Sequence, residues 1–168
     1  MKDGKYSVMI VEDQQMPKAL FSHFVESSDK FYLQVAIENA SVADIVCTRT
    51  PVDLILMDVV TENGESGLEA AAKIKAKFPK TKIIIVTSMP ECSYIKRAKQ
   101  IGVEGFWYKE VNEQPILSLM ERVMNGEIVY PDMRLRASLP DRYTCKTPGR
   151  GSAARRKPAA RLRRIRRE

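Results

Sequence analysis

The sequence predicts an α/β protein in which five parallel strands and five helices form a doubly wound sheet. Five short runs rich in aliphatic and aromatic residues alternate with segments in which apolar residues recur every three or four positions. The central run is apolar from Leu54 to Met57, which is typical of a strand buried on both faces. It then ends abruptly on Asp58, a carboxylate that is costly to bury alone. We expect strands over residues 6–11, 31–38, 53–57, 82–86 and 105–108, and helices over 14–27, 41–49, 68–78, 90–101 and 113–125.

In the first half of the chain, the strands are assigned from β-branched and aromatic residues and the helices from spacing. Met16, Leu20 and Phe24 step by four along one face of the first helix. Ser41 can cap the second helix. A polar loop, residues 61–65, follows the central strand.

In the second half, the third helix has the clearest pattern, since its apolar residues step by three and four with lysines between them and Pro79 follows. These apolar residues are Leu68, Ala71, Ile74 and Phe78. Pro90 can open the fourth helix. Gly102 and Gly126 can end the last two helices.

The formal net charge of +7 arises entirely from the C-terminal part. Residues 1–133 hold 15 Lys and Arg against 19 Asp and Glu, a balance of −4, whereas residues 134–168 hold 13 against 2, a balance of +11. The first part therefore makes no electrostatic case for nucleic acid. Periodicity stops after Pro131, so we expect a domain over residues 1–130 and a basic, disordered tail over residues 131–168.

Cysteine usage and hydropathy indicate the cellular compartment in which the protein is expected. Cys47, Cys92 and Cys145 are odd in number and form no CxxC pair, which favours a reducing environment over a disulfide scaffold or a zinc site. The first apolar stretch runs straight into acids, so no signal peptide is expected. The longest aliphatic run, residues 83–86, is too short to span a bilayer. We expect a soluble, cytoplasmic protein that makes no membrane contact.

Polar residues follow four of the predicted strands: Glu12 and Asp13 the first, Asp58 the third, Thr87 the fourth and Lys109 the fifth. With strand order 2-1-3-4-5, the first and third strands are neighbours, so three carboxylates converge at the switch point of the sheet. Their mutual repulsion calls for a cation, and Mg²⁺ suits oxygen ligands best. A carboxylate nucleophile, a metal, an ammonium group and a hydroxyl donor are what phosphoryl transfer requires.

These motifs resemble the receiver domain of bacterial two-component response regulators, in particular the LuxR/FixJ-type group. The motifs are Glu12-Asp13, Asp58, Val86-Thr87-Ser88 and Trp107-Tyr108-Lys109, in order and at strand ends. The resemblance covers about residues 5–130 and implies a flavodoxin-like fold. It also implies a signalling switch that catalyses only its own phosphotransfer and dephosphorylation, with Asp58 accepting a phosphoryl group from a sensor histidine kinase in a phosphorelay. Transcription regulation is the output typical of the group.

The resemblance also implies a role for each site residue. Asp13 and Asp58 would bind Mg²⁺ directly, Glu12 through water, and Val60 through its carbonyl group. Three groups would contact the phosphoryl oxygens beside Lys109: the Thr87 hydroxyl and the backbone N–H groups of Val60 and Ser88. Phe106, three residues before Lys109, matches the aromatic position that switches together with Thr87.

The sequence departs from the family pattern in two places, and the first of them supports a second interpretation. The loop before Gly67-Leu68-Glu69 is one residue longer than usual, and Glu110 stands where many receivers have a cis-proline. A receiver-like interaction module that works without phosphorylation is the alternative. A phosphatase of the haloacid-dehalogenase type ranks last, because Glu12-Asp13-Gln14-Gln15 lacks the Asp-x-Asp spacing expected after its first strand.

The tail and the output surface complete the expectations. LuxR/FixJ-type regulators usually carry a helix-turn-helix domain after the receiver, but residues 134–168 are too few for one and lack an apolar helical pattern. A truncated or frame-shifted output domain and a natural basic extension, able to bind any polyanion including DNA, are both left open. We also expect a phosphorylation-dependent homodimer through the fourth helix, fifth strand and fifth helix, a surface that includes Tyr94, Lys96 and residues 106–114.

Overall fold

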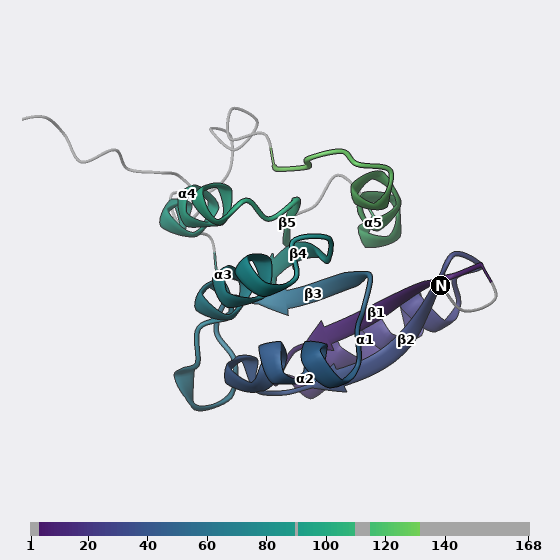
Figure 1. The fold of residues 1–168 in the computed structure, drawn as a ribbon, viewed down its shortest axis with the longest axis horizontal. Coiled ribbons are helices and arrows are strands. Elements are labelled where there is room, and N and C mark those ends of the chain that lie inside the picture. Colours follow the sequence, from purple (N-terminus) through teal and green to yellow (C-terminus); the bar gives the residue numbers. More distant parts are fainter. Residues whose placement is uncertain (1–3, 90, 110–114, 132–168) are drawn as a thin grey trace, which may run out of the picture.

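The computed structural model describes residues 4–89, 91–109 and 115–131, and it confirms the predicted sheet. Five parallel strands lie in the order β2-β1-β3-β4-β5 (Figure 1). The strands are β1 (Tyr6–Val11), β2 (Phe31–Ile37), β3 (Leu54–Asp58), β4 (Lys82–Thr87) and β5 (Gly105–Tyr108). The helices are α1 (Gln15–Glu26), α2 (Ala43–Arg49), α3 (Gly67–Lys77), α4 (Cys92–Ile101) and α5 (Ile116–Met124), with short 3₁₀ turns η1 (Ala40–Val42) and η2 (Glu62–Gly64).

Several predictions from the sequence fall on residues outside these ranges. The expected helix starts at Pro90 and Glu113, residue Glu110, and the tail beyond Pro131 all lie outside the described residues. The boundary between a domain and a basic tail therefore stays a prediction. None of the helices in the described part of the chain is long and apolar enough to cross a bilayer.

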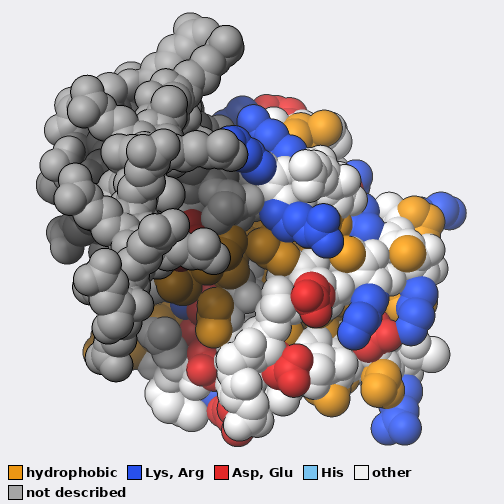
Figure 2. Space-filling model, turned by 90° about the vertical axis from the view of Figure 1, so that its left-hand side faces the viewer, with side chains coloured by type: hydrophobic (Ala, Val, Ile, Leu, Met, Phe, Trp, Pro, Cys, Tyr) orange, Lys and Arg blue, Asp and Glu red, His pale blue; other side chains and the backbone are white. Residues whose placement is uncertain are grey.

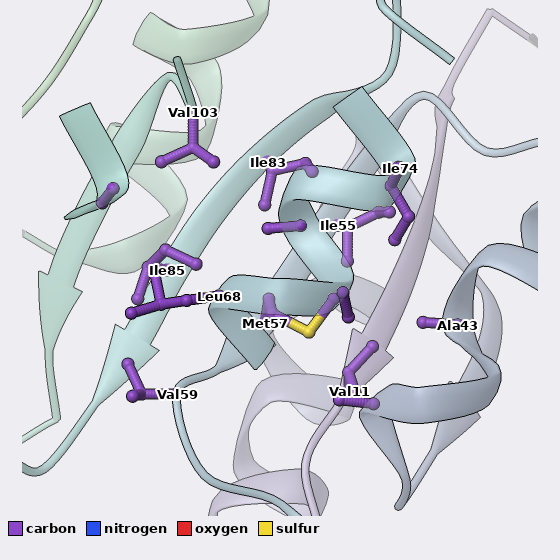
Figure 3. Packing of buried hydrophobic residues seen from close by; sticks show 14 of the residues in the cluster. Val11, Ala43, Ile55, Met57, Val59, Leu68, Ile74, Ile83, Ile85 and Val103 are labelled. Carbon is purple, nitrogen blue, oxygen red and sulfur yellow. The ribbon is translucent and has the colours of Figure 1, made fainter. Parts of the chain in front are cut away.

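The core has two layers because each strand sends alternate side chains to opposite faces of the sheet. One layer packs the sheet against α2, α3 and α4 (Figure 3). Its strand residues include Met9, Val11, Ile55, Met57, Ile83 and Ile85. The other layer packs the sheet against α1 and α5, and its strand residues include Val8, Ile10, Leu54, Leu56, Ile84 and Val86. Burial on both faces explains why the central strands read as continuous apolar runs.

Of the apolar stripe that its four-residue spacing suggested, helix α1 packs only Phe24 against the core, where it is partly buried. Met16 is 82% exposed and Leu20 47% exposed, whereas Phe21 and Val25 are buried against the sheet. Both stripes have helical spacing, so periodicity alone could not choose between them. The choice depends on where the neighbouring strands and α5 lie.

The start of the second helical segment also differs from the prediction. Asn39, rather than Ser41, provides the cap: its side-chain oxygen accepts a hydrogen bond from Ser41 N at 2.8 Å. The turn η1 then precedes α2. Gly102 ends α4 in the left-handed conformation, with φ of 83°, as its position predicted.

Helices α3 and α4 lie side by side on one face of the molecule, and their outer surface is polar. Figure 2 shows one side of the molecule, on which lysine and arginine side chains lie among acidic ones. On α3 and α4 themselves the exposed charged residues are mostly basic: Lys73, Lys77, Lys96, Arg97 and Lys99 against Glu69. The described outer surface of these two helices therefore has a basic excess.

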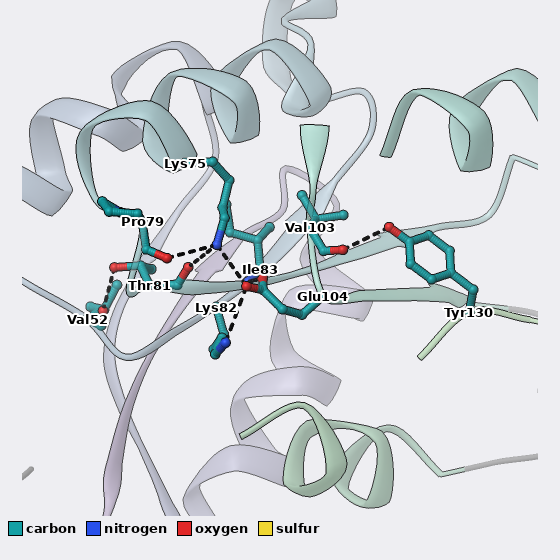
Figure 4. A network of polar contacts seen from close by, with 9 residues as sticks. All are labelled: Val52, Lys75, Pro79, Thr81, Lys82, Ile83, Val103, Glu104 and Tyr130. Carbon is teal, nitrogen blue, oxygen red and sulfur yellow. Dashed lines mark hydrogen bonds and ion pairs between the residues drawn. The ribbon is translucent and has the colours of Figure 1, made fainter. Parts of the chain in front are cut away.

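A polar network joins α3, β4 and β5 near the amino-terminal ends of these two strands (Figure 4). The Glu104 carboxylate accepts hydrogen bonds from Lys75 Nζ at 2.8 Å and from Ile83 N at 3.0 Å, and Lys82 Nζ lies 3.4 Å away. Lys75 also donates to the carbonyl oxygens of Pro79 and Thr81. The side chains of Lys75 and Glu104 are largely buried, so the pair is well shielded from solvent.

Removing the Glu104 carboxylate should destabilise the domain. Glu104→Ala leaves Lys75 without its carboxylate partner and should cost about 2 kcal/mol of unfolding free energy. Glu121→Ala is the control, since it breaks the exposed pair with Lys30 and should cost less than about 1 kcal/mol. Urea unfolding measures both. Equal losses in the two variants would contradict a special contribution from the buried pair.

Candidate functional site

The carboxyl ends of the strands bring the predicted acids together, as the topology required. β1 pairs with β3 in the register Val11↔Met57, which places Glu12 and Asp13 beside Asp58. One carboxylate oxygen from each acid lies within 4.8 Å of the other two. The predicted convergence of three carboxylates is therefore confirmed.

Two of these acids are removed from water. Glu12 is 1% exposed and Asp58 is 6% exposed. Burial raises the pKa of Asp58 above its ordinary value, and the charge of Asp13 adds to this effect while Lys109 opposes it. Burial likewise raises the pKa of Glu12, with Asp58 contributing and Lys109 opposing. The site thus holds negative charge where solvent screens it poorly.

Lys109 is the cation that partly balances this charge. Its Nζ donates to Asp58 Oδ2 at 2.7 Å and also contacts the Glu12 carboxylate. Its backbone N–H donates to Thr87 O, which fixes the start of the segment after β5 against β4. One ammonium group against three carboxylates leaves a charge of −2 when all are ionised, which a divalent cation would neutralise.

The donor set fits a hard divalent cation such as Mg²⁺. Carboxylate oxygens are the ligands that Mg²⁺ prefers. Asp13 Oδ1 is buried and has no hydrogen-bond partner among the described residues. Because a buried acceptor without a partner is costly, a metal ligand role gives this oxygen a physical purpose.

The backbone around Asp58 is held in place by α3. Asp58 Oδ1 accepts a hydrogen bond from Val59 N at 2.6 Å, and Val59 O accepts one from Gly67 N at 2.8 Å. A Cβ on Gly67 would lie 1.7 Å from the Asp58 carbonyl oxygen, so only glycine permits this approach. The sequence contained the signal, in Gly67-Leu68-Glu69, but the reason for the glycine emerges only from the packing.

The long loop after β3 is folded back on itself. Val60 and Ser66 form an antiparallel bridge, and Asn63 and Gly64 make the turn with positive φ values of 61° and 73°. The buried Thr61 hydroxyl accepts a hydrogen bond from Ala40 N and donates one to a carbonyl oxygen of the loop, which ties the loop to η1. Sequence reasoning did not identify Thr61, because its partners are distant in the chain or within the loop itself.

The remaining predicted residues lie on β4 and β5 or in the segments that follow β3 and β4. Thr87 is buried, and its Oγ1 accepts a hydrogen bond from Met89 N at 3.1 Å. Ser88 follows it in a bend and is partly exposed. Phe106 lies inside β5 and is buried. The proposed roles of Val60, Thr87, Ser88 and Phe106 stay predictions.

The fold and the acidic site define a class of protein. The model of the response regulator receiver domain family matches residues 8–121, and the chain belongs to this family. Oxygen regulatory protein NreC of Staphylococcus aureus is 30% identical over 137 residues, which cover 81% of this chain and 62% of that relative. The chain therefore spans less than two thirds of the length of this curated relative. NreC of Staphylococcus haemolyticus is 29% identical over the same length.

Solved structures support the same fold. A LuxR-family two-component response regulator from Aurantimonas superposes with a TM-score of 0.69 at 19% identity, covering 74% of this chain and 89% of that one. A LuxR-family DNA-binding response regulator from Staphylococcus aureus gives a TM-score of 0.66 at 24% identity, covering 71% and 99%. These likenesses establish the receiver architecture.

Removing one acid should stabilise the metal-free protein. Asp13→Asn lowers the repulsion on Asp58 and should raise the melting temperature without metal by about 3 °C, while abolishing the protection that Mg²⁺ gives the wild type. Asp29→Asn, at an exposed position before β2, is the control. Thermal unfolding with and without Mg²⁺ measures the effect. Identical metal-free melting temperatures of Asp13→Asn and the wild type, with equal protection by Mg²⁺, would show that the three acids share no metal site.

The raised pKa values of Glu12 and Asp58 predict a pH dependence. The ordinary pKa values of Glu12 and Asp58 are 4.5 and 3.8, and the folded protein still binds protons at these groups at a pH where the unfolded chain has lost them. The free energy of unfolding without metal therefore falls as pH rises from about 4. Asp44, whose pKa is lowered by Lys77, acts in the opposite direction. Comparing Asp58→Asn with the wild type by urea unfolding isolates the site. The advantage of Asp58→Asn should widen with pH, and a constant difference would contradict the prediction.

Proposed function

We propose that this chain is a phosphorylation-dependent signalling switch in which Asp58 accepts a phosphoryl group from a phosphohistidine of a sensor histidine kinase. The observation that carries the proposal is the position of Asp58, which ends a buried strand among two further acids and Lys109. An acid with only a structural role would gain nothing from two neighbouring carboxylates, because repulsion from each of them raises the free energy of its ionised form. The chain's family membership supports the same conclusion.

In the proposed reaction a carboxylate oxygen of Asp58 attacks phosphorus, and an O–P bond forms as the P–N bond to the histidine breaks. The imidazole nitrogen keeps the electron pair of the broken bond. Mg²⁺, when bound to the acids, neutralises charge on the phosphoryl oxygens. Val59 N holds one oxygen of the carboxylate in place, which fixes the orientation of the other.

We propose that Lys109 and Thr87 recognise the transferred group. In the unphosphorylated protein Lys109 pairs with Asp58 and Glu12, and conversion of Asp58 to an acyl phosphate removes its carboxylate charge. The ammonium group can then turn to the phosphoryl oxygens. Thr87 can give up its contact with Met89 N and donate its hydroxyl proton to the same group, together with the N–H groups of Val60 and Ser88.

The names of two similar proteins support a proposal for the output. NreC is named as an oxygen regulatory protein, and one structural neighbour is named as a DNA-binding regulator. We therefore propose transcription regulation as the output, with any DNA contact supplied by an output region or by the basic residues 134–168. We also propose a cytoplasmic location, as expected for a protein that takes part in the proposed phosphorelay. A phosphorylation-dependent homodimer stays a prediction.

A receiver-like interaction module that acts without phosphorylation is the second candidate. Two observations favour it: the folded loop of residues 60–66, which Thr61 ties to η1, and the ion pairs that already occupy Lys109. Both features resist rearrangement of the site. The two candidates differ in whether Asp58 becomes phosphorylated at all.

Incubation with Mg²⁺ and acetyl phosphate should add one phosphate-sized mass to the wild type and none to Asp58→Asn. Intact-mass spectrometry under mildly acidic conditions, where acyl phosphates survive best, measures the adduct. Asp29→Asn is the matched control and should be modified like the wild type, since its residue lies outside the site. A wild type that gains no mass and matches Asp58→Asn would favour the interaction module.

A further inference from the structure

The chain after α5 returns to the edge of the sheet and pairs with β5. Residues 127–130, here called the edge segment, run parallel to β5 with Val129 opposite Gly105. Val129 N donates to Glu104 O at 2.8 Å, and Phe106 N donates to Val129 O at 3.0 Å. The segment therefore extends the sheet by one short pairing beyond the five strands.

Tyr130 fastens the end of this segment. Its hydroxyl group donates to Val103 O at 2.8 Å (Figure 4), and Lys99 Nζ lies 5.0 Å from the centre of its ring. Burial raises the pKa of Tyr130 to about 12, and the charge of Glu104 adds to the effect. The hydroxyl group is thus a neutral donor across the physiological range of pH.

Phe106 connects this fastening to the strand ends of the site. Its ring stacks on Tyr130 with centroids 6.4 Å apart and planes inclined by 25°, and it meets Tyr108 at 5.0 Å. Tyr108 is the register partner of Thr87. The edge segment therefore contacts Phe106 twice: Val129 O accepts a hydrogen bond from its backbone N–H, and Tyr130 stacks on its ring.

The hold of the edge segment on the sheet is small compared with that of a core strand. Val129 is its one buried residue, whereas Glu127 is exposed and Ile128 is 73% exposed. Two backbone hydrogen bonds with β5 and the contacts of Tyr130 supply the rest. Segments with few buried apolar contacts open at a lower free energy than the core of the same protein.

We propose that the edge segment is a clasp, with Tyr130 as its fastening, that opens when the Asp58 site is occupied by a phosphoryl group. The clasp rests on the proposed function and adds to it the route by which the site acts on the chain after residue 131. A movement of Phe106 toward Thr87 withdraws its ring from Tyr130 and shifts the N–H that Val129 O accepts. The edge segment then loses its partners on β5.

Coupling of this kind must act in both directions. If occupancy of the site opens the clasp, weakening the clasp must raise the affinity of the site by the same factor. A segment that merely ends the domain would show neither effect. This reciprocity separates a coupled clasp from a static one.

Hydrogen exchange on the full chain, with Mg²⁺ and with or without beryllofluoride as the phosphoryl mimic, tests the first direction. The amides of Phe106 and Val129 should exchange at least about fivefold faster in the bound state, the lower end of typical allosteric coupling. The amide of Ile10, in the middle of β1, is the internal control and should not change. Slower or unchanged exchange at Phe106 and Val129, with beryllofluoride bound, would overturn the clasp.

Calorimetric titration with beryllofluoride in the presence of Mg²⁺ tests the second direction. Tyr130→Ala should bind at least about fivefold more tightly than the wild type, and Tyr130→Phe, which keeps the ring and loses the hydroxyl group, should fall between them. Ile128→Ala is the matched control within the same segment and should bind like the wild type.

The outcomes distinguish failure of the clasp from failure of the proposed function on which it rests. Wild-type affinity in both Tyr130 variants would overturn the clasp and leave phosphorylation of Asp58 standing. Tyr130→Phe preserves this test if Tyr130→Ala does not fold. A wild-type chain that neither binds beryllofluoride nor gains a phosphate from acetyl phosphate would overturn the proposed function, and the clasp with it.

Discussion

The site depends on holding three carboxylates together, two of them buried where water screens their charge poorly. Glu12 and Asp58 are buried at the carboxyl edge of the sheet, and Asp13 keeps one buried oxygen without a hydrogen-bond partner. Lys109 offsets part of the repulsion through Asp58 and Glu12. A site whose carboxylates repel one another without a metal gains most from binding one.

Strand β5 lies between two groups of polar interactions, one at its amino-terminal end and one at its carboxyl-terminal end. Glu104, just before β5, receives hydrogen bonds from Lys75 and Ile83, while Lys109, just after it, reaches the acids. Between these ends, Phe106 contacts both Tyr108 and Tyr130. Buried ion pairs flank the strand at both ends, and the edge segment pairs with its first residues.

Much of the fold could be read from the sequence because its cause is local. Continuous apolar runs ending on polar residues indicate buried parallel strands, and the alternation with helices then determines which strand ends meet. The convergence of Glu12, Asp13 and Asp58 followed from that topology, since carboxyl ends of neighbouring parallel strands share one edge. The receiver family could be recognised for the same reason: its motifs are strand-end residues in a fixed order.

By itself the sequence determined the strands and the identity of the acids, because these depend on residue type and short-range spacing, whereas the strand order was taken from the doubly wound fold class. Only the tertiary structure decided which stripe of α1 faces the sheet, why residue 67 must be glycine, and that Thr61 ties the loop to η1. It alone brought Tyr130 onto Phe106, 24 positions away in the sequence. These features arise from contacts between segments that are far apart in the chain, and no local pattern of residues encodes the distance between two such surfaces.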